Sequence, residues 1–315
     1  MTPVGTATEA PEQPTVVQPA VPPYQPAHRD RPPRRPPLPG PAVAVIRISI
    51  GSALLALWVV FFALGLAGFE AARSQLVLYS QLRTQLADAT EPIGGPIDPG
   101  TPVALIEAQR IDLRYVVVEG TAAGDLRAGP GHRRDTPLPG QAGTCVLYGR
   151  ATGFGGPFRH ILDLRPGDTI TVTTGQGTFG YRVDGVRRAG DPLPGLLPSG
   201  GGRLTLVTAE GVSWRAGWAP NRVAYVDATL QGTPQPAPAG RLTGVPKADL
   251  AMQGDPDALV PVVLWLQLLI LGGVGAAWAQ RRWGGAQAWL VFTPVILATL
   301  WGASESAIQL LPNLM

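Results

Sequence analysis

The sequence predicts a mainly β domain held outside the membrane, together with three transmembrane α-helices. Short β-branched runs separated by Gly and Pro fill residues 101–230, and three long apolar runs lie outside that region. The positions of the arginines then orient the chain. The formal net charge of +3 is spread along the sequence without a dense basic face, so we expect no nucleic-acid partner.

The numbers and positions of the cysteine and histidine residues restrict the possible disulfide bonds and metal sites. Cys145 is the single cysteine, which excludes an intrachain disulfide framework. The three histidines (His28, His132 and His160) are scattered and have no cluster of Cys or acidic residues around them. We therefore expect neither a metal site nor a cofactor.

The N-terminal residues 1–47 are rich in Pro, Gln, Thr and Ala, and later in Arg. Such a composition buries too little apolar surface to offset the entropy of ordering. We predict a disordered cytoplasmic tail, with a Pro-rich ligand for a partner as the alternative.

Three apolar runs are long enough to cross a bilayer. Residues 48–69 contain no charge and follow a long polar segment, which favours an uncleaved helix over a signal peptide. Residues 258–279 are interrupted only by Gln267, and a third run covers residues 286–306. We expect three transmembrane helices in the plasma membrane, with the lipid bilayer as a partner.

Charged flanks predict one topology for all three runs. Arginines precede the first run, Arg281 and Arg282 separate the second from the third, and Asp255 and Asp257 lie on the opposite side of the second. Because basic flanks stay in the cytoplasm, the N-terminus should be inside and residues 70–257 and the C-terminus outside.

The extracytoplasmic part divides into three segments. Residues 70–100 begin with good helix formers and should form a stalk, and residues 231–257 have no strong pattern and should form a flexible linker. Between them, residues 101–230 should form one compact β-barrel or sandwich. The expected strands are VALIEA, YVVVEG, TCVLYG, DTITVTT, TFGYRVDGV, RLTLVTA and RVAYVDATL.

The residues of this region carry a family resemblance. The spaced blocks GPGH…LPGQ…G, then FxxxLxLxPGD, then LTLVT occur in order between about residues 100 and 230, behind a membrane anchor. Together they resemble a class E-type sortase, of the kind found in actinobacteria. The resemblance implies a closed β-barrel and a cysteine transpeptidase that attacks the Thr–Gly bond of a sorting signal.

Carried over position by position, the implied catalytic set is incomplete. The nucleophile's position at the end of RLTLVTA is Ala209, and the histidine's position is Arg150, in Tyr-Gly-Arg. A methyl group cannot attack a carbonyl, and arginine stays protonated, so neither residue can replace the family's group. The oxyanion-stabilising arginine corresponds to Arg222. Ala209 should still open on a cleft.

Other nucleophiles and bases fit less well. Cys145 should point away from Arg150 because side chains alternate along a strand, and it is typical of a buried structural cysteine. Ser213 has no evident base, His160 is expected at the surface, and His132 is expected in a turn outside the catalytic set.

The resulting function hypothesis is a binding protein. Arg150, Glu210 and Arg222 are the candidate residues for holding a carboxylate or an extended peptide; the alternative for Glu210 is that it offsets local positive charge or faces water. We expect a membrane-anchored, sortase-like pseudoenzyme that binds a sorting-signal-like peptide, or that partners an active sortase or another cell-envelope protein. The alternatives are a transpeptidase or hydrolase with a relocated nucleophile and a structural membrane subunit.

Overall fold

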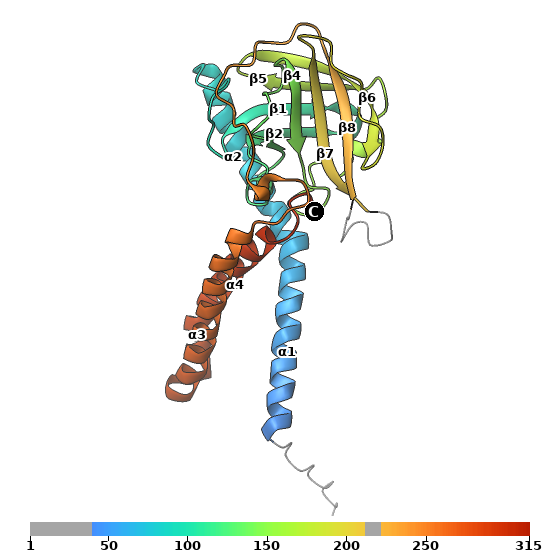
Figure 1. Cartoon of the computed structure of the whole chain (residues 1–315). Helices are drawn as coiled ribbons and strands as arrows, with labels where there is room; N and C mark the ends of the chain where they lie inside the picture. Colours follow the sequence, from blue (N-terminus) through green and yellow to red (C-terminus); the bar gives the residue numbers. More distant parts are fainter. Residues whose placement is uncertain (1–39, 212–221) are drawn as a thin grey trace, which may run out of the picture. The chain divides into compact units, whose positions relative to one another are not determined.

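The computed structural model describes residues 40–211 and 222–315. Its centre is a closed barrel of eight strands (Figure 1). The strands are β1 (Pro102–Ala108), β2 (Leu113–Glu119), β3 (Gly131–His132), β4 (Gly143–Tyr148), β5 (Thr169–Thr174), β6 (Gly177–Arg188), β7 (Gly202–Glu210) and β8 (Arg222–Gln231).

The barrel order is β1-β2-β3-β4-β7-β8-β6-β5, and β5 pairs with β1 to close it. Two neighbouring pairs, β2 with β3 and β4 with β7, are parallel, and the remaining pairs are antiparallel. The parallel β4–β7 pair matters for function, because it brings the ends of two strands that are far apart in sequence to the same rim.

Alternation of side chains builds the core of the barrel. On β7, Leu204 and Leu206 are fully buried inside the barrel with Leu147 of β4 and Val226 of β8. Removing these side chains from water is the main favourable contribution to folding of such a domain. All seven strands expected from the sequence are present, and the barrel alternative is confirmed. The eighth strand, β3, has two residues, too few to show a period.

Helices precede the barrel. Helix α1 (Gly40–Phe61) runs through a π-helical turn, Phe62–Leu66, into α2 (Ala67–Ala87). Leu78 and Leu82 of α2 are buried with Val116 and Val118 of β2. The segment expected as a stalk therefore packs against the barrel.

The expectation of three membrane-spanning helices is not confirmed. In the part of the chain that the structure describes, two helices are long and apolar enough to cross a membrane, Pro256–Trp283 and Gly285–Gln309. The π-helical turn interrupts the α-helical hydrogen bonding within residues 48–69, and only a shorter apolar helical stretch, Ser49–Trp58, is found there.

The two long apolar helices form a hairpin of α3 (Leu259–Trp283) and α4 (Gly285–Gln309). The backbone N–H of Asp255 donates to the carbonyl of Gln309 at 2.8 Å, so the hairpin begins and ends at one place. Short helical turns connect the other elements: Gln109–Ile111, Asp125–Arg127, Ile161–Asp163, Lys247–Asp249 and Pro256–Ala258.

Candidate functional site

The ends of β4 and β7 and the start of β8 meet at one rim of the barrel. Beyond the last ladder pair of β4 and β7, the Gly149 N–H donates to the carbonyl of Val207 at 3.0 Å, and the hydroxyl of Thr208 donates to the carbonyl of Gly149 at 3.0 Å. On the other side of β7, Ala209 lies opposite Val223 and Glu210 lies opposite Arg222. The structure thus brings the sequence-predicted positions 150, 209, 210 and 222 to the same rim.

Ala209 is buried, with 4% of its surface exposed. It belongs to an apolar cluster with Leu126, Tyr148, Val207 and Leu314, and Ala251 and Met252 are packed against that cluster. The expectation that residue 209 opens on a cleft is therefore wrong in this structure. The residues that cover it come from the linker and from the segment that follows α4, which no local pattern assigned to the site.

Arg150 is also buried, with 2% exposed. Its Nη1 donates to the carbonyl oxygen of Met315 at 2.8 Å, its Nη2 donates to that of Ala123 at 2.8 Å, and its guanidinium lies 5.0 Å from the centre of the Phe154 ring. Burial lowers the pKa of Arg150 to about 10, and the charge of Arg127 acts in the same direction. The group therefore stays charged at neutral pH and is a donor of hydrogen bonds, not of protons.

Glu210 and Arg222 lie at the edge of the site. Glu210 accepts two hydrogen bonds from the Arg188 guanidinium, at 2.7 and 2.8 Å, and these bonds lower the pKa of its carboxyl. Arg222 is exposed at the first position of β8. Glu210 thus offsets local positive charge, as one reading of the sequence expected, whereas the assignment of Arg222 and Glu210 to peptide binding stays a prediction.

A groove of about 430 Å³ runs along the outer face of β4, β7 and β8. Arg203, Thr205 and Val207 line it from β7, and Ala209 continues the same face of that strand. The remaining lining residues are Arg133, Thr144, Val146, Tyr148, Arg187, Leu193, Pro194, Tyr225 and Asp227. The groove therefore leads along β7 toward positions 209 and 150.

Charged residues of the groove are held in fixed positions. The carboxylate of Asp227 accepts from Arg187 Nε and from the hydroxyl of Thr205, both at 2.7 Å, and the Arg187 guanidinium stacks 4.1 Å from the centre of the Tyr225 ring. Arg203 donates to the carbonyl of Gly195 at 2.8 Å. Sequence reasoning missed these residues, although the alternation of RLTLVTAEG places Arg203, Thr205, Val207 and Ala209 on one face.

The alternative nucleophiles gain no support from the structure. Cys145 is buried inside the barrel with 1% exposed, and burial raises the pKa of its thiol well above the usual range, which disfavours the reactive thiolate. His160 is a surface residue 3.2 Å from Asp163, as expected. Ser213 and His28 lie outside the described residues.

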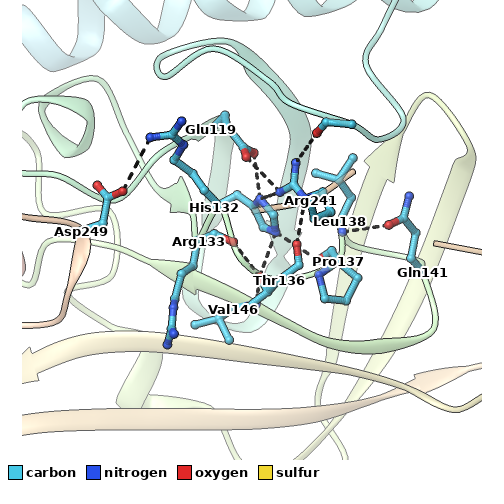
Figure 2. A network of polar contacts seen from close by, with 12 residues as sticks. Glu119, His132, Arg133, Thr136, Pro137, Leu138, Gln141, Val146, Arg241 and Asp249 are labelled. Atoms are coloured by element: carbon cyan, nitrogen blue, oxygen red, sulfur yellow. Dashed lines mark hydrogen bonds and ion pairs between the residues drawn. The ribbon is translucent and has the colours of Figure 1, made fainter. Parts of the chain in front are cut away.

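His132 belongs to a second polar cluster and not to the rim. It lies in β3, not in a turn, and is fully buried, with Nδ1 2.8 Å from Oε2 of Glu119 and Nε2 3.0 Å from the carbonyl oxygen of Pro137. Figure 2 shows Arg241 reaching the same pair: its Nη2 lies 2.9 Å from Oε1 of Glu119. Arg241 comes from the segment expected as a flexible linker, so this network fastens that segment to the barrel.

The fold and the rim define a class of protein: a closed eight-stranded β-barrel with a groove that leads to the ends of β4 and β7. Comparison with known proteins identifies the family of this barrel. Residues 106–227 match the family model described as sortase domain. These residues therefore form a domain of the sortase family.

The matches to individual relatives span only part of each relative's length. Over 86 residues, or 27% of this chain, it is 31% identical to Sortase D of Bacillus subtilis, and over 112 residues, or 33% of this chain, it is 31% identical to Sortase SrtE1 of Streptomyces coelicolor. The matches span 42% and 30% of those two relatives, less than half of each.

Solved sortase structures are also similar to this chain. Sortase E1 from Streptomyces coelicolor with a tripeptide in its active site is 26% identical, covers 49% of this chain and 100% of its own, and has a TM-score of 0.35. A Clostridium perfringens Sortase D5 transpeptidase is 22% identical, covers 51% and 99%, and has a TM-score of 0.40.

Proposed function

We propose that this chain is a membrane-anchored, sortase-like pseudoenzyme that binds an extended peptide of the sorting-signal type without cleaving it. The observation that carries the proposal is the groove on β4, β7 and β8, which leads to positions where an alanine and an arginine stand. Sortase-type chemistry needs a thiolate and a group that titrates near neutral pH, and Ala209 and Arg150 supply neither.

The groove suits an extended peptide for two reasons. Val146, Leu193 and Tyr225 offer apolar surface that is at least partly exposed, and Arg133, Arg187 and Arg203 offer donors to carbonyl or carboxylate oxygens. Anchoring by the α3–α4 hairpin would hold this groove close to the membrane. At this location the groove could meet the sorting signal of a secreted protein. The domain could also dock there on an active sortase or another cell-envelope protein.

Binding and turnover can be measured together on the full chain in detergent. A fluorescent peptide that contains a Thr–Gly sorting motif should bind saturably and release no product. Arg203→Glu should weaken binding by about tenfold, because it reverses a charge in the groove wall. Arg182→Glu, the same change on the exposed surface of β6, is the matched control and should leave binding unchanged.

Two results would contradict the proposal in different ways. If the wild-type chain cleaves the peptide and the Cys145→Ala chain still does so, the active site lies elsewhere and the chain is not a pseudoenzyme. Equal binding of the peptide by the wild-type and Arg203→Glu chains would show that the peptide does not bind in the groove. A double change, Ala209→Cys with Arg150→His, should restore at most slow thiol-dependent acylation, because the supporting side chains around the site are now those of a buried apolar cluster.

A further inference from the structure

Residues 312–315, which follow α4, lie on the rim at the end of the groove. The backbone N–H of Ala151 donates to the carbonyl of Leu314 at 2.9 Å, and Arg150 donates to the carbonyl of Met315 at 2.8 Å. Arg150 and its neighbour thus bind the main chain of a segment more than 150 residues away. Hydrogen bonds to main-chain carbonyls are the contacts that hold a peptide in an extended-peptide site.

The side chains of this segment are bound as closely as its main chain. The side-chain amide of Asn313 is fully buried and donates to the carbonyls of Thr121, at 2.8 Å, and Leu250, at 2.9 Å. Its backbone N–H donates to the carbonyl of Gln253 at 2.9 Å. Buried donors are costly unless they are hydrogen-bonded, so these carbonyls form a socket for a side-chain NH2 group, whereas Oδ1 of Asn313 has no hydrogen-bond partner among the described residues.

Leu314 fills the apolar end of the site. It is fully buried and belongs to the cluster of Leu126, Tyr148, Val207 and Ala209. Tyr148 and Val207 of this cluster also line the groove. The apolar socket and the groove therefore share residues, and Leu314 packs in the same cluster as Ala209.

We infer that the degenerate site is a socket for a short extended segment with a side-chain amide followed by an apolar residue, and that residues 312–315 are its resident ligand. The inference rests on the proposed function and identifies the occupant of the same site. An external peptide reaches positions 150 and 209 only when this segment is displaced. Because the segment is tethered through α4, its effective concentration at the site is high and an external peptide competes at a disadvantage.

Accessibility of position 209 tests the inference. A thiol is introduced by Ala209→Cys in a Cys145→Ala chain, and its reaction with a neutral fluorescent maleimide is followed on the full chain in detergent. With residues 312–315 unchanged, labelling should be slow. Adding Leu314→Asp should accelerate it at least tenfold, because a carboxylate is expelled from an apolar socket. Labelling at the same rate with and without Leu314→Asp would overturn the inference.

The matched control is Leu311→Asp, the same change three residues away at a side chain that is 48% exposed. It should leave the labelling rate within about twofold of the parent. A thermal melt distinguishes release of the segment from unfolding of the barrel. If Leu314→Asp lowers the melting temperature strongly, Asn313→Ala replaces it, since it removes only the two hydrogen bonds that the amide donates. Unchanged labelling in a folded Asn313→Ala chain would equally overturn the inference.

A peptide supplied in trans separates this inference from the proposed function. The peptide Gln-Leu-Leu-Pro-Asn-Leu-Met, which has the sequence of residues 309–315, should slow labelling of the Leu314→Asp chain, and a scrambled peptide should not. Failure of this peptide to protect would count against the inference. Failure of the Thr–Gly peptide to bind the released chain, while the resident segment still protects position 209, would remove the proposed external ligand and leave the inference standing.

Discussion

Close packing at the residue scale explains the Tyr-Gly-Arg sequence at the end of β4. A Cβ atom on Gly149 would collide with the ring of Phe158, a fully buried side chain of the barrel core. The absence of a side chain at 149 lets the chain pass the ring and place Arg150 against the carbonyls of Ala123 and Met315. Gly149 is thus required by a close approach and not by an unusual backbone angle.

We therefore predict that Gly149→Ala destabilises the protein by about 1–3 kcal/mol, the usual cost of overpacking a core. Gly180→Ala on β6 is the control, because a Cβ atom there meets no atom within 4 Å. Chemical denaturation of the full chain in detergent measures both changes. Equal stabilities of the two variants would show that the Phe158 ring moves aside without cost.

The buried carboxyl group of Glu91 should make the stability of the protein depend on pH. The side chain is buried, and burial raises the pKa of its carboxyl to about 8. A carboxyl whose pKa is raised on folding contributes stability that is complete below its unfolded pKa, near 4.5, and is lost as the pH rises through about 8. Wild-type stability should fall across this interval, because the folded protein must then bury a charge.

Glu91→Gln removes the titration at this position. Relative to wild type, the melting temperature of the variant should rise steadily between pH 5 and pH 8.5. The expected total is a few degrees, since each kcal/mol of stability corresponds to roughly 2–4 °C. The difference between the two melting temperatures is the quantity to measure, because Asp125, whose pKa burial raises to about 6, titrates in both proteins. A difference that stays constant with pH would contradict the prediction.

The sequence identified the rim residues but not the burial of two of them, Arg150 and Ala209. Arg150, Ala209, Glu210 and Arg222 follow from strand ends and from a family resemblance, and they meet at one rim. The cover over Arg150 and Ala209 comes from residues 250–253 and 312–315, which carry no period and no motif. Long-range contacts, such as the hydrogen bond of Asn313 to Thr121 and the packing of Leu314 against Ala209, place them there, and such contacts leave no trace in local sequence.

Strand β7 is the element on which both faces of the site depend. Its even-numbered leucines face the barrel core, and its odd-numbered residues line the groove and the apolar socket. A shift of one residue in its register would exchange these faces. The parallel ladder with β4 and the antiparallel ladder with β8 fix the register on both sides.

Truncating the core face of β7 should therefore cost more than truncating an exposed leucine. Leu204→Ala and Leu206→Ala should each destabilise the protein by about 2–5 kcal/mol, since both side chains are fully buried. Leu196→Ala, at a fully exposed side chain, should change stability by less than about 0.5 kcal/mol. Melting curves that do not separate the two leucines of β7 from Leu196 would refute the assigned faces.

Elements with a clear period were predictable, and short or irregular ones were not. The seven long strands show β-branched runs between turns, and the structure has all of them. The two-residue β3 and the π-helical turn Phe62–Leu66 lack any such period. The segment expected as a flexible linker is held by Arg241, whose partners Glu119 and His132 lie more than 100 residues earlier.

At the scale of the whole molecule, the hairpin α3–α4 is joined to the barrel at both of its ends. Residues 241–253 lead into it and residues 312–315 lead out of it, and both contact the barrel or its connecting loops: Arg241 contacts His132 of β3, Thr121 donates to the carbonyl of Asp249, and Arg150 donates to the carbonyl of Met315. The bond between Asp255 and Gln309 places the two ends together. If the hairpin crosses a membrane, the barrel and residues 312–315 must then lie on the same side, which the inferred resident ligand requires.

The last prediction concerns that topology. The arginine-rich flanks predict that the barrel lies outside and that the turn between α3 and α4 lies in the cytoplasm. Single cysteines introduced by Ser80→Cys and Gly285→Cys, in a Cys145→Ala chain, should differ in labelling by a membrane-impermeant maleimide on intact cells. Ser80 is exposed on α2, and Gly285 is preferable to Gly284, whose backbone φ of +102° disfavours any other residue.

The expected result is labelling of the Ser80→Cys chain in intact cells and of the Gly285→Cys chain only after the membrane is permeabilised. Permeabilised cells are the control for reactivity, because both positions are exposed in the folded protein. Labelling of Gly285→Cys but not of Ser80→Cys in intact cells would reverse the orientation of the hairpin. Equal labelling of both positions in intact cells would show that the hairpin does not cross the membrane, and the barrel would then be held by another part of the chain.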